Sequence, residues 1–191
     1  MTKIRRKALI ALGSNENSAW GDRAETIQKA SQEIEKLSLS RARLSSSYAT
    51  PAFPAGAGHE FVNAAMVIVS DLEPAEILAA LHRIEADAGR ARHVRWGQRT
   101  LDLDLIACAA DVIPDIATFE HWRDLPLEVQ TTTAPECLIL PHPRLQDRAF
   151  VLVPLADVAP DWSHPVSGLR VVEMLAALPA PDRQQVRRLN P

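Results

Sequence analysis

The sequence predicts an α+β fold built on an antiparallel sheet. Short apolar segments rich in β-branched residues alternate with segments of helical periodicity, and they follow the order strand, helix, strand, strand, helix, strand up to residue 108. Apolar residues make up 47% of the 191 residues and charged residues 24%, which is the composition of an ordinary globular chain. We therefore expect a single domain that covers residues 1–191.

The first strand and helix follow a basic N-terminal segment. Ala8 to Leu12 is a compact apolar strand that ends at Gly13-Ser14-Asn15. From Ala24 to Leu37, apolar residues recur at three- and four-residue spacing, which predicts an amphipathic helix. Arg43 to Thr50 predicts a short strand, which Pro51 stops because it cannot donate to a ladder of hydrogen bonds.

The next elements complete a known unit. FVNAAMVIVS, from Phe61 to Ser70, predicts a central strand, and Pro74 suits the first turn of the helix that follows. This helix should end at Gly89, and Leu101 to Cys108 should form the next strand. The βαββαβ order is that of the ferredoxin-like fold, in which both helices cover one face of the sheet.

The chain after Cys108 extends this unit. Residues 109–140 form a long insert in which Phe119 and Trp122 predict a short helix, either packed on its own domain or bordering the functional site. A C-terminal amphipathic helix is predicted from Val171 to Leu178, and the residues after Pro179 are expected to fray. We therefore expect a C-terminal helical extension.

Charge and composition narrow the functional class. The formal net charge of −3 favours neither nucleic acid nor a membrane surface as a partner, and no apolar run has the length of a membrane helix. A chain of this size has core enough without a disulfide, so Cys108 and Cys137 are expected to be reduced thiols. We expect a cytoplasmic, monomeric protein whose partners are small molecules.

Asp102 and Asp104 are the first candidate functional residues. Residues two apart in a strand share a face, so both carboxylates should point one way and Leu101, Leu103 and Leu105 toward the core. Paired carboxylates suit a hard cation such as magnesium. The alternative is a solvated strand face that carries two unrelated acids.

Four arginines, at positions 90, 92, 95 and 99, precede this strand. Guanidinium groups match the geometry of phosphate oxygens. Beside a carboxylate pair they indicate phosphoryl transfer, in which positioning and charge neutralisation supply most of the catalysis. No series of stacking aromatics accompanies them, so we expect a small acceptor rather than a nucleic acid.

The segment RWGQRTLDLDLI, residues 95–106, resembles the signature of the 6-hydroxymethyl-7,8-dihydropterin pyrophosphokinases, which transfer the β,γ-pyrophosphate of ATP to a pterin hydroxymethyl group. Other segments resemble family motifs in the family order: ALGSN, YATPAF, FVNAA, RIEADAGRAR and PHPRLQDRAFVLVPLADVAPD. The resemblance covers most of the chain. It implies a ferredoxin-like, ATP-dependent enzyme of folate biosynthesis.

This resemblance also implies roles for individual residues. Asp102 and Asp104 would bind two magnesium ions that bridge ATP and the pterin hydroxyl, and Arg90 and Arg99 would stabilise the transferred group. The implied ATP-binding residues are Leu78, Glu85, Arg92, Leu105, His142 and Arg148.

A pterin is a flat polar ring system, so its site should combine aromatic faces with amide-type hydrogen bonds. The resemblance implies such a set, which consists of Thr50, Pro51, Phe53, Phe61, Asn63, Trp96 and Phe150. Phe61 and Asn63 are two apart on one predicted strand and therefore share a face.

Several of these residues have simpler interpretations. Taken alone, Glu85 indicates a solvated helix charge, His142 a turn residue beside proline, and Phe150 an ordinary core aromatic. Gln98 also stands where the family has proline or a small residue. Two other functions stay open: a nucleotidyltransferase would share the paired carboxylates, and a non-catalytic paralogue would bind pterin or nucleotide without turnover.

Overall fold

The computed structural model describes residues 4–51, 59–89, 100–126, 128–129 and 133–189. Within these ranges six strands form one sheet, and they are β1 (Arg6–Ser14), β2 (Arg43–Leu44), β3 (Tyr48–Thr50), β4 (Phe61–Ser70), β5 (Asp102–Cys108) and β6 (Arg187–Arg188). The order across the sheet is β5-β1-β4-β3-β6, and β2 also pairs with β4. Every pair of strands is antiparallel.

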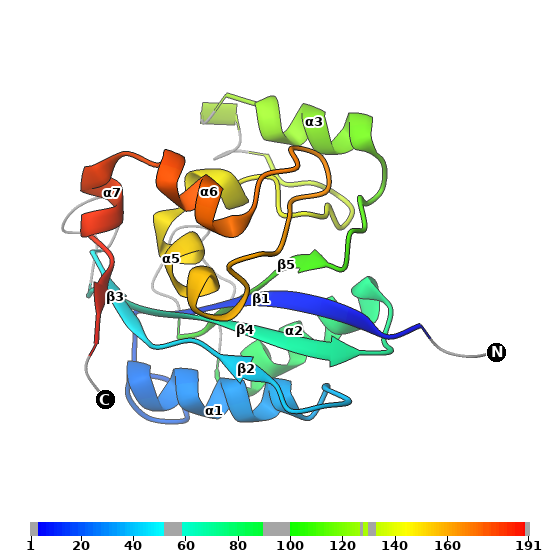
Figure 1. Cartoon of the computed structure of the whole chain (residues 1–191). Coiled ribbons are helices and arrows are strands. Elements are labelled where there is room, and N and C mark those ends of the chain that lie inside the picture. The colour runs from blue at the N-terminus through cyan, green and yellow to red at the C-terminus, as the bar shows by residue number, and fades with distance from the viewer. Residues whose placement is uncertain (1–3, 52–58, 90–99, 127, 130–132, 190–191) are drawn as a thin grey trace.

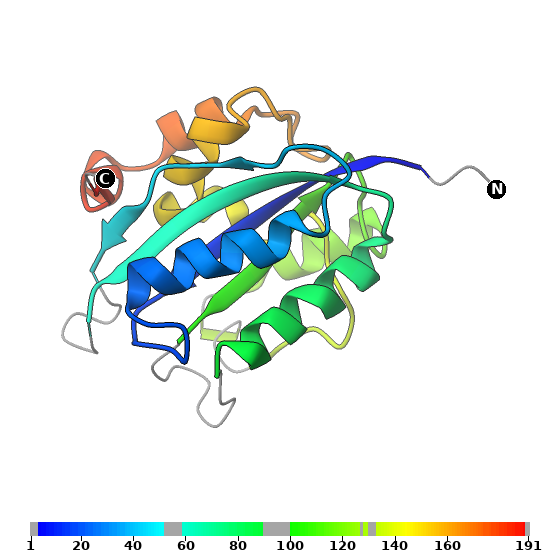
Figure 2. The same cartoon turned by 90° about the horizontal axis from the view of Figure 1, so that it is seen from below.

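Helices cover both faces of this sheet. They are α1 (Arg23–Glu35), α2 (Pro74–Asp87), α3 (Ile116–Asp124), α5 (Ala149–Val158), α6 (Val171–Ala177) and α7 (Ala180–Gln184), with a 3-10 turn η1 (Leu145–Asp147). Figure 1 shows α1 and α2 below the sheet and α5 and α6 above it, with α3 as an outer element. From below, α1 and α2 lie side by side along the strands (Figure 2).

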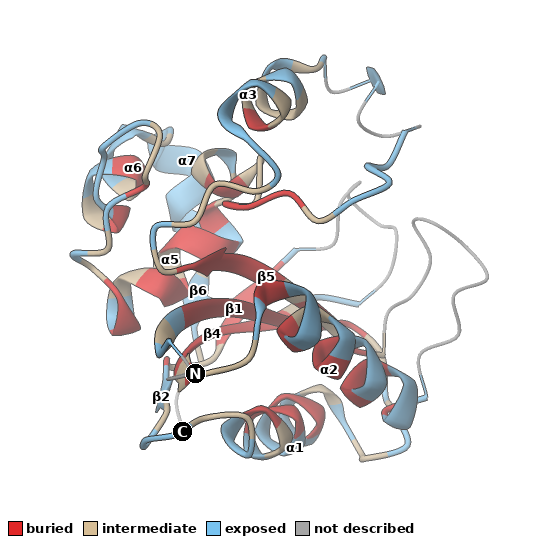
Figure 3. Cartoon of the chain, turned by 90° about the vertical axis from the view of Figure 1, so that its right-hand side faces the viewer, coloured by how far each residue is buried: buried red, intermediate tan, exposed pale blue. Residues whose placement is uncertain are grey.

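Alternate residues of β1 belong to two different cores. Ala8, Ile10 and Leu12 are buried with α1 and α2, whereas Leu9 and Ala11 are buried with α5 and α6. The alternation follows from the two-residue period of a strand. Buried residues therefore line the strands between two helical layers, as the red colouring of β1, β4 and β5 shows (Figure 3).

The main strands and the first two helices lie where the sequence predicts them. β4 has the predicted bounds, and β1 and β5 contain or nearly match the predicted segments. Helix α1 begins after Asp22, whose side chain accepts hydrogen bonds from the backbone of Ala24 and Glu25. Helix α2 has Pro74 in its first turn and ends before Gly89, whose φ of 82° is the left-handed conformation that favours glycine.

The structure differs from the sequence analysis in three segments. The segment from Arg43 to Thr50 is two short strands, because the hydroxyl of Ser45 accepts a hydrogen bond from the backbone N–H of Ala65 in place of a ladder bond. The AFVLVPLADV segment, for which no element was predicted, is helix α5 and includes Pro154. The expected fraying after Pro179 is wrong, because α7 and β6 are ordered there.

The insert contains the predicted helix, α3, which begins at an N-terminal cap formed by Asp115. Phe119 is fully buried, and its ring centroid lies 5.4 Å from that of His164. Trp162 also contacts His164, with 5.9 Å between the ring centroids. Helix α3 is therefore packed on the turn between α5 and α6. This packing buries the apolar side chain of Phe119.

Two further sequence expectations concern cysteine and membranes. Cys108 is buried and Cys137 exposed, and both are free thiols, as predicted. Burial raises the pKa of the Cys108 thiol to about 11, so it is protonated at neutral pH. None of the helices in the described ranges is long and apolar enough to span a membrane.

Helix α5 is fastened to β3 through Asp157. One carboxylate oxygen, Oδ2, accepts hydrogen bonds from the Tyr48 hydroxyl at 2.9 Å and from the backbone N–H of Ser46 at 3.1 Å. Burial and this carboxylate raise the pKa of Tyr48, so the hydroxyl remains a donor at neutral pH. The contact joins the helical layer of α5 and α6 to strand β3 and the residues just before it.

We expect Tyr48→Phe to lower the free energy of unfolding by about 1–2 kcal/mol, because it removes a hydrogen bond to a charged acceptor. Urea unfolding followed by circular dichroism measures this change. Asp157→Asn is the matched variant: it keeps an oxygen acceptor but removes the charge, and should cost less. An unchanged midpoint for Tyr48→Phe would show that the contact contributes nothing.

Candidate active site

The centre of the candidate site is a row of residues across three strands. Gly13 on β1 lies directly opposite Asn63 on β4 and Asp102 on β5. One step along β1, Ala11 lies opposite Asp104. Residues that pair directly across an antiparallel ladder share a face, so both carboxylates and Asn63 lie on the face that α5 and α6 partly cover.

Asp102 and Asp104 have the orientation predicted for them. Leu101, Leu103 and Leu105 are buried in the core with α1 and α2, whereas the two carboxylates on the opposite face are partly exposed. No group of three or more His, Cys, Asp or Glu side chains suited to a metal was found among the described residues. Two carboxylates without further protein ligands fit magnesium, which keeps waters and substrate phosphates as its other ligands.

Glu85 is buried, with an exposed fraction of 2%, so it is not the solvated helix charge that its position alone indicates. Its Oε1 accepts a hydrogen bond from the backbone N–H of Leu103 at 2.8 Å. Leu103 lies between Asp102 and Asp104, and this contact joins the end of α2 to the strand that carries both carboxylates. In the described geometry Glu85 positions β5.

His142 combines a turn contact with a place beside the carboxylate strand. Its backbone N–H bonds to the carbonyl of Ile106 at 2.7 Å, and its Nδ1 accepts from the backbone N–H of Arg144 at 3.0 Å. Burial and the nearby Arg148 lower the pKa of His142 to about 3. The ring is therefore neutral at physiological pH, and its Nδ1 accepts the hydrogen bond from Arg144.

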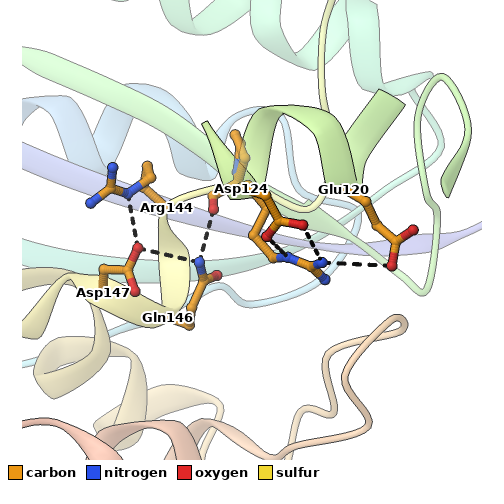
Figure 4. A network of polar contacts seen from close by, with 7 residues as sticks. Glu120, Asp124, Arg144, Gln146 and Asp147 are labelled. Carbon is orange, nitrogen blue, oxygen red and sulfur yellow. Dashed lines mark hydrogen bonds and ion pairs between the residues drawn. The ribbon is translucent and has the colours of Figure 1, made fainter. Parts of the chain in front are cut away.

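Arg148 links the carboxylates to the turn. Its Nη1 lies 3.7 Å from Asp104 Oδ2 and 3.5 Å from His142 Nε2. The turn itself is fixed by an ion pair of 2.8 Å between Arg144 and Asp147, to which Gln146 also donates. Figure 4 shows Arg144 and Gln146 both directed at Asp147, with Asp124 and Glu120 of α3 in the same view.

The residues assigned to the pterin gather at the neighbouring strands. Asn63 is buried, and its Nδ2 donates to Thr50 Oγ1 at 2.8 Å, which fixes the orientation of the amide. A Cβ placed on Gly13 would lie 3.3 Å from Asn63 Oδ1 and 3.9 Å from Phe61 Cδ1. Asn63 and Phe61 therefore share a face, as predicted. Pro51 follows β3 and is exposed.

Phe150 is exposed to 42%, which contradicts its interpretation as a core aromatic. It lies in the first turn of α5, where the inward positions are taken by Val151, Leu152 and Leu155. The guanidinium of Arg148 lies 5.7 Å from the centroid of its ring. An aromatic face beside an arginine is thus available near the carboxylates.

The remaining assigned residues lie elsewhere. Leu105 is buried and Leu78 partly buried in the core with α1 and α2, so their side chains face away from the carboxylates. The assignments of Arg90, Arg92, Arg99, Phe53 and Trp96 fall outside the described residues.

Sequence reasoning placed Gly13 at the end of a strand and within the ALGSN motif, but gave it no role of its own in the candidate site. Its missing side chain leaves space between Asn63 and Asp102, and the nearest atoms to a Cβ there would belong to residues of the site. A glycine inside a strand often marks the close approach of a ligand or another backbone. Applied to the segment ALIALGS, this rule could have indicated from the sequence that Gly13 lies at a site.

A family model described as 7,8-dihydro-6-hydroxymethylpterin-pyrophosphokinase (HPPK) matches residues 9–160. The chain belongs to this family. A relative from Pseudomonas aeruginosa, named 2-amino-4-hydroxy-6-hydroxymethyldihydropteridine pyrophosphokinase, is 36% identical over 91% of this chain and 92% of its own length. A relative of the same name from Synechocystis is 34% identical over 88% of this chain and 74% of its own length.

Solved structures agree with this family at the level of fold. The HPPK-DHPS protein of Plasmodium falciparum, wild type, matches with a TM-score of 0.63 and 14% sequence identity. The match covers 92% of this chain but 45% of that one, so this chain spans less than half of the solved protein. HPPK membership therefore rests on sequence, and these structures support a mixed fold of helices on an antiparallel sheet.

The neutral state of His142 makes stability depend on pH. Because its folded pKa is near 3 and its ordinary value is 6.5, the unfolded chain takes up a proton below pH 6.5 that the folded chain does not. We expect the free energy of unfolding of the wild type to fall by about 1–2 kcal/mol more than that of His142→Gln between pH 7.5 and pH 5. Urea unfolding at both pH values measures the difference, and parallel losses would contradict it.

Proposed function

We propose that this chain transfers the β,γ-pyrophosphate of ATP to the hydroxymethyl group of 6-hydroxymethyl-7,8-dihydropterin, with AMP as the second product. The observation that carries the proposal is the strand register of the site, which aligns Asn63, Gly13 and Asp102 across one face. Within an HPPK family member, that row brings the carboxylates assigned to magnesium beside the amide assigned to the pterin.

The assigned residues fit a division of the site into two parts. Asn63, Thr50, Phe61 and Phe150 would hold the pterin by hydrogen bonds and by contact with aromatic faces. His142 and Arg148 would contact the phosphates, because a neutral imidazole N–H and a guanidinium both donate to phosphate oxygens. Gly13 separates the two parts and leaves room for the reacting hydroxymethyl group.

Magnesium is proposed at Asp102 and Asp104, as two ions shared with the ATP phosphates. When bound, it supplies charge neutralisation for the transferred group and lowers the pKa of the attacking hydroxyl. Glu85 holds the strand between the two carboxylates by its bond to Leu103. In the proposed reaction these residues would orient the hydroxyl for in-line attack on the β-phosphorus, with AMP as the leaving group.

Arg90, Arg92 and Arg99 remain proposed ligands of the phosphates, Phe53 and Trp96 remain proposed parts of the pterin site, and Leu78 and Leu105 remain proposed ATP contacts. The side chains of both leucines are in the core. Leu105 would therefore contact ATP through its backbone peptide groups rather than its side chain. We further propose one ferredoxin-like domain over residues 1–191, extended by the insert 109–140 and the later helices, and a monomer that works on small molecules.

The first test is AMP release by the purified protein from ATP and magnesium, with and without the pterin. We expect AMP formation that depends on the pterin, since water should not replace the acceptor in a site that orders both substrates. A folded protein that binds the pterin without releasing AMP would favour the non-catalytic paralogue. Release of inorganic pyrophosphate would indicate nucleotidyl transfer instead.

Asp102→Asn and Asp104→Asn should each lower turnover by about 10³-fold or more, because the lost charge neutralisation amounts to several kcal/mol in the transition state. Pterin affinity without ATP should stay near the wild-type value. Asp111→Asn is a matched control, because Asp111 pairs with Arg6 beyond the far end of β5. Near wild-type turnover in either site variant would refute the assignment.

A further inference from the structure

The C-terminal segment is part of the sheet that carries the site. Strand β6 pairs with β3, with Arg187 opposite Ala49 and Arg188 opposite Tyr48. The backbone N–H of Leu189 donates a hydrogen bond to the carbonyl of Ser47 at 2.9 Å. The Leu189 side chain packs against the core between the sheet and helices α1 and α2. The segment thus covers the edge of β3 that would otherwise be unpaired.

The two arginines of β6 contact different parts of the chain. Arg187 Nη2 donates to Glu60 Oε1 at 2.7 Å, whereas Arg188 Nη2 donates to the hydroxyl of Ser46 at 2.6 Å. Neighbouring residues of a strand point to opposite faces, which explains why their contacts differ. Only Arg187 reaches across to the residues that precede β4.

Glu60 is held by more than Arg187. The guanidinium of Arg23, at the start of α1, donates to the backbone carbonyl of Glu60. The preceding residue, His59, has its Nδ1 3.2 Å from Glu16 Oε1. Residues 59–60 are therefore held by side chains from two segments that are distant in sequence, the region between β1 and the start of α1 and the strand β6.

Strand β6 consequently holds the chain on both sides of the stretch 51–58. On one side it pairs with Ala49, and the next residue, Thr50, accepts the hydrogen bond from Asn63. On the other side it holds Glu60, and the next residue is Phe61, which lies over Gly13. Both contacts of β6, with Ala49 and with Glu60, are therefore one residue away from a residue assigned to the pterin site.

We propose that Arg187 is a positioning residue for the pterin end of the site, acting through Glu60 on Phe61. This inference rests on the proposed function, because it assumes that Phe61, Thr50 and Asn63 bind the pterin. Arg187 does not touch the substrate. It sets the place where β4 begins, while the backbone of β6 sets the place where β3 ends.

The expected effect is specific and moderate. The Arg187 and Glu60 side chains are exposed to 59% and 50%, and exposed ion pairs add little to global stability. Loss of the pair should therefore leave the melting temperature nearly unchanged. The pterin should bind about three- to fivefold more weakly, the effect of losing an interaction of that kind at one end of the site.

The test compares Arg187→Gln with Arg188→Gln, which removes the same charge from the adjacent position. Pterin affinity is measured by calorimetry with magnesium and α,β-methylene-ATP, whose α–β bridge cannot be broken by the transfer, and the affinity for this nucleotide is measured separately. We expect Arg187→Gln alone to weaken pterin binding, with nucleotide affinity unchanged in both variants. Glu60→Arg should weaken it too, and Glu60→Arg with Arg187→Glu should restore it.

Three results would overturn the inference: equal pterin affinity in the two glutamine variants, a parallel loss of nucleotide affinity and melting temperature in Arg187→Gln, or no rescue by the charge reversal. The wild type separates this failure from failure of the proposed function. If the wild type binds the nucleotide and pterin and releases AMP, only the role of Arg187 is rejected. If it binds neither, the proposed function and this inference both fail.

Discussion

The register of β1 between β4 and β5 is the constraint on which the site depends. Because side chains alternate along a strand, a shift of one residue would exchange the two faces. Asp102 and Asp104 would then enter the apolar core with α1 and α2, and Leu103 would take their place beside Asn63. Burial of two unpaired carboxylates costs far more than a local rearrangement, so the same leucines that stabilise the core also hold the carboxylates on the other face.

One face of the sheet serves first as core and then as site. Near the middle of β1 it is covered by α5, and Leu9, Ile106 and Ala107 are buried there. Toward the end of β1 the residues become smaller, Ala11 and then Gly13, while β5 changes from apolar side chains to carboxylates. Arg148 and Phe150 stand where α5 begins, at the boundary between the two regions. The two carboxylates therefore lie in the part of this face that the helical layer leaves partly exposed, next to the buried Asn63.

The features that follow from hydrophobic periodicity could be predicted from the sequence. The features that depend on contacts between distant segments could not. Phe61 to Ser70 is mostly apolar, with Asn63 as the polar exception inside the strand, and polar residues bound it, so β4 was predictable with its ends. Asp102 and Asp104 were predictable as a pair because alternation with leucine leaves one orientation. Glu85 was not, since its burial depends on the backbone of Leu103, 18 residues away. β6 depends on an unpaired edge at β3, about 140 residues earlier in the sequence, and no local pattern in the tail reports that edge.

The candidate site is assembled from segments that meet only in the folded sheet. Asn63 and Thr50 come from different strands, His142 and Arg148 from the turn after the insert, and Arg187 from the last strand. The row at Gly13 requires β1, β4 and β5 together, because each neighbouring pair of these strands supplies only one side of it. Pairing of these three strands and alignment of the carboxylates with Asn63 are therefore the same event. In the proposed positioning role, the contact between Arg187 and Glu60 would act on this row only through the start of β4, at Phe61.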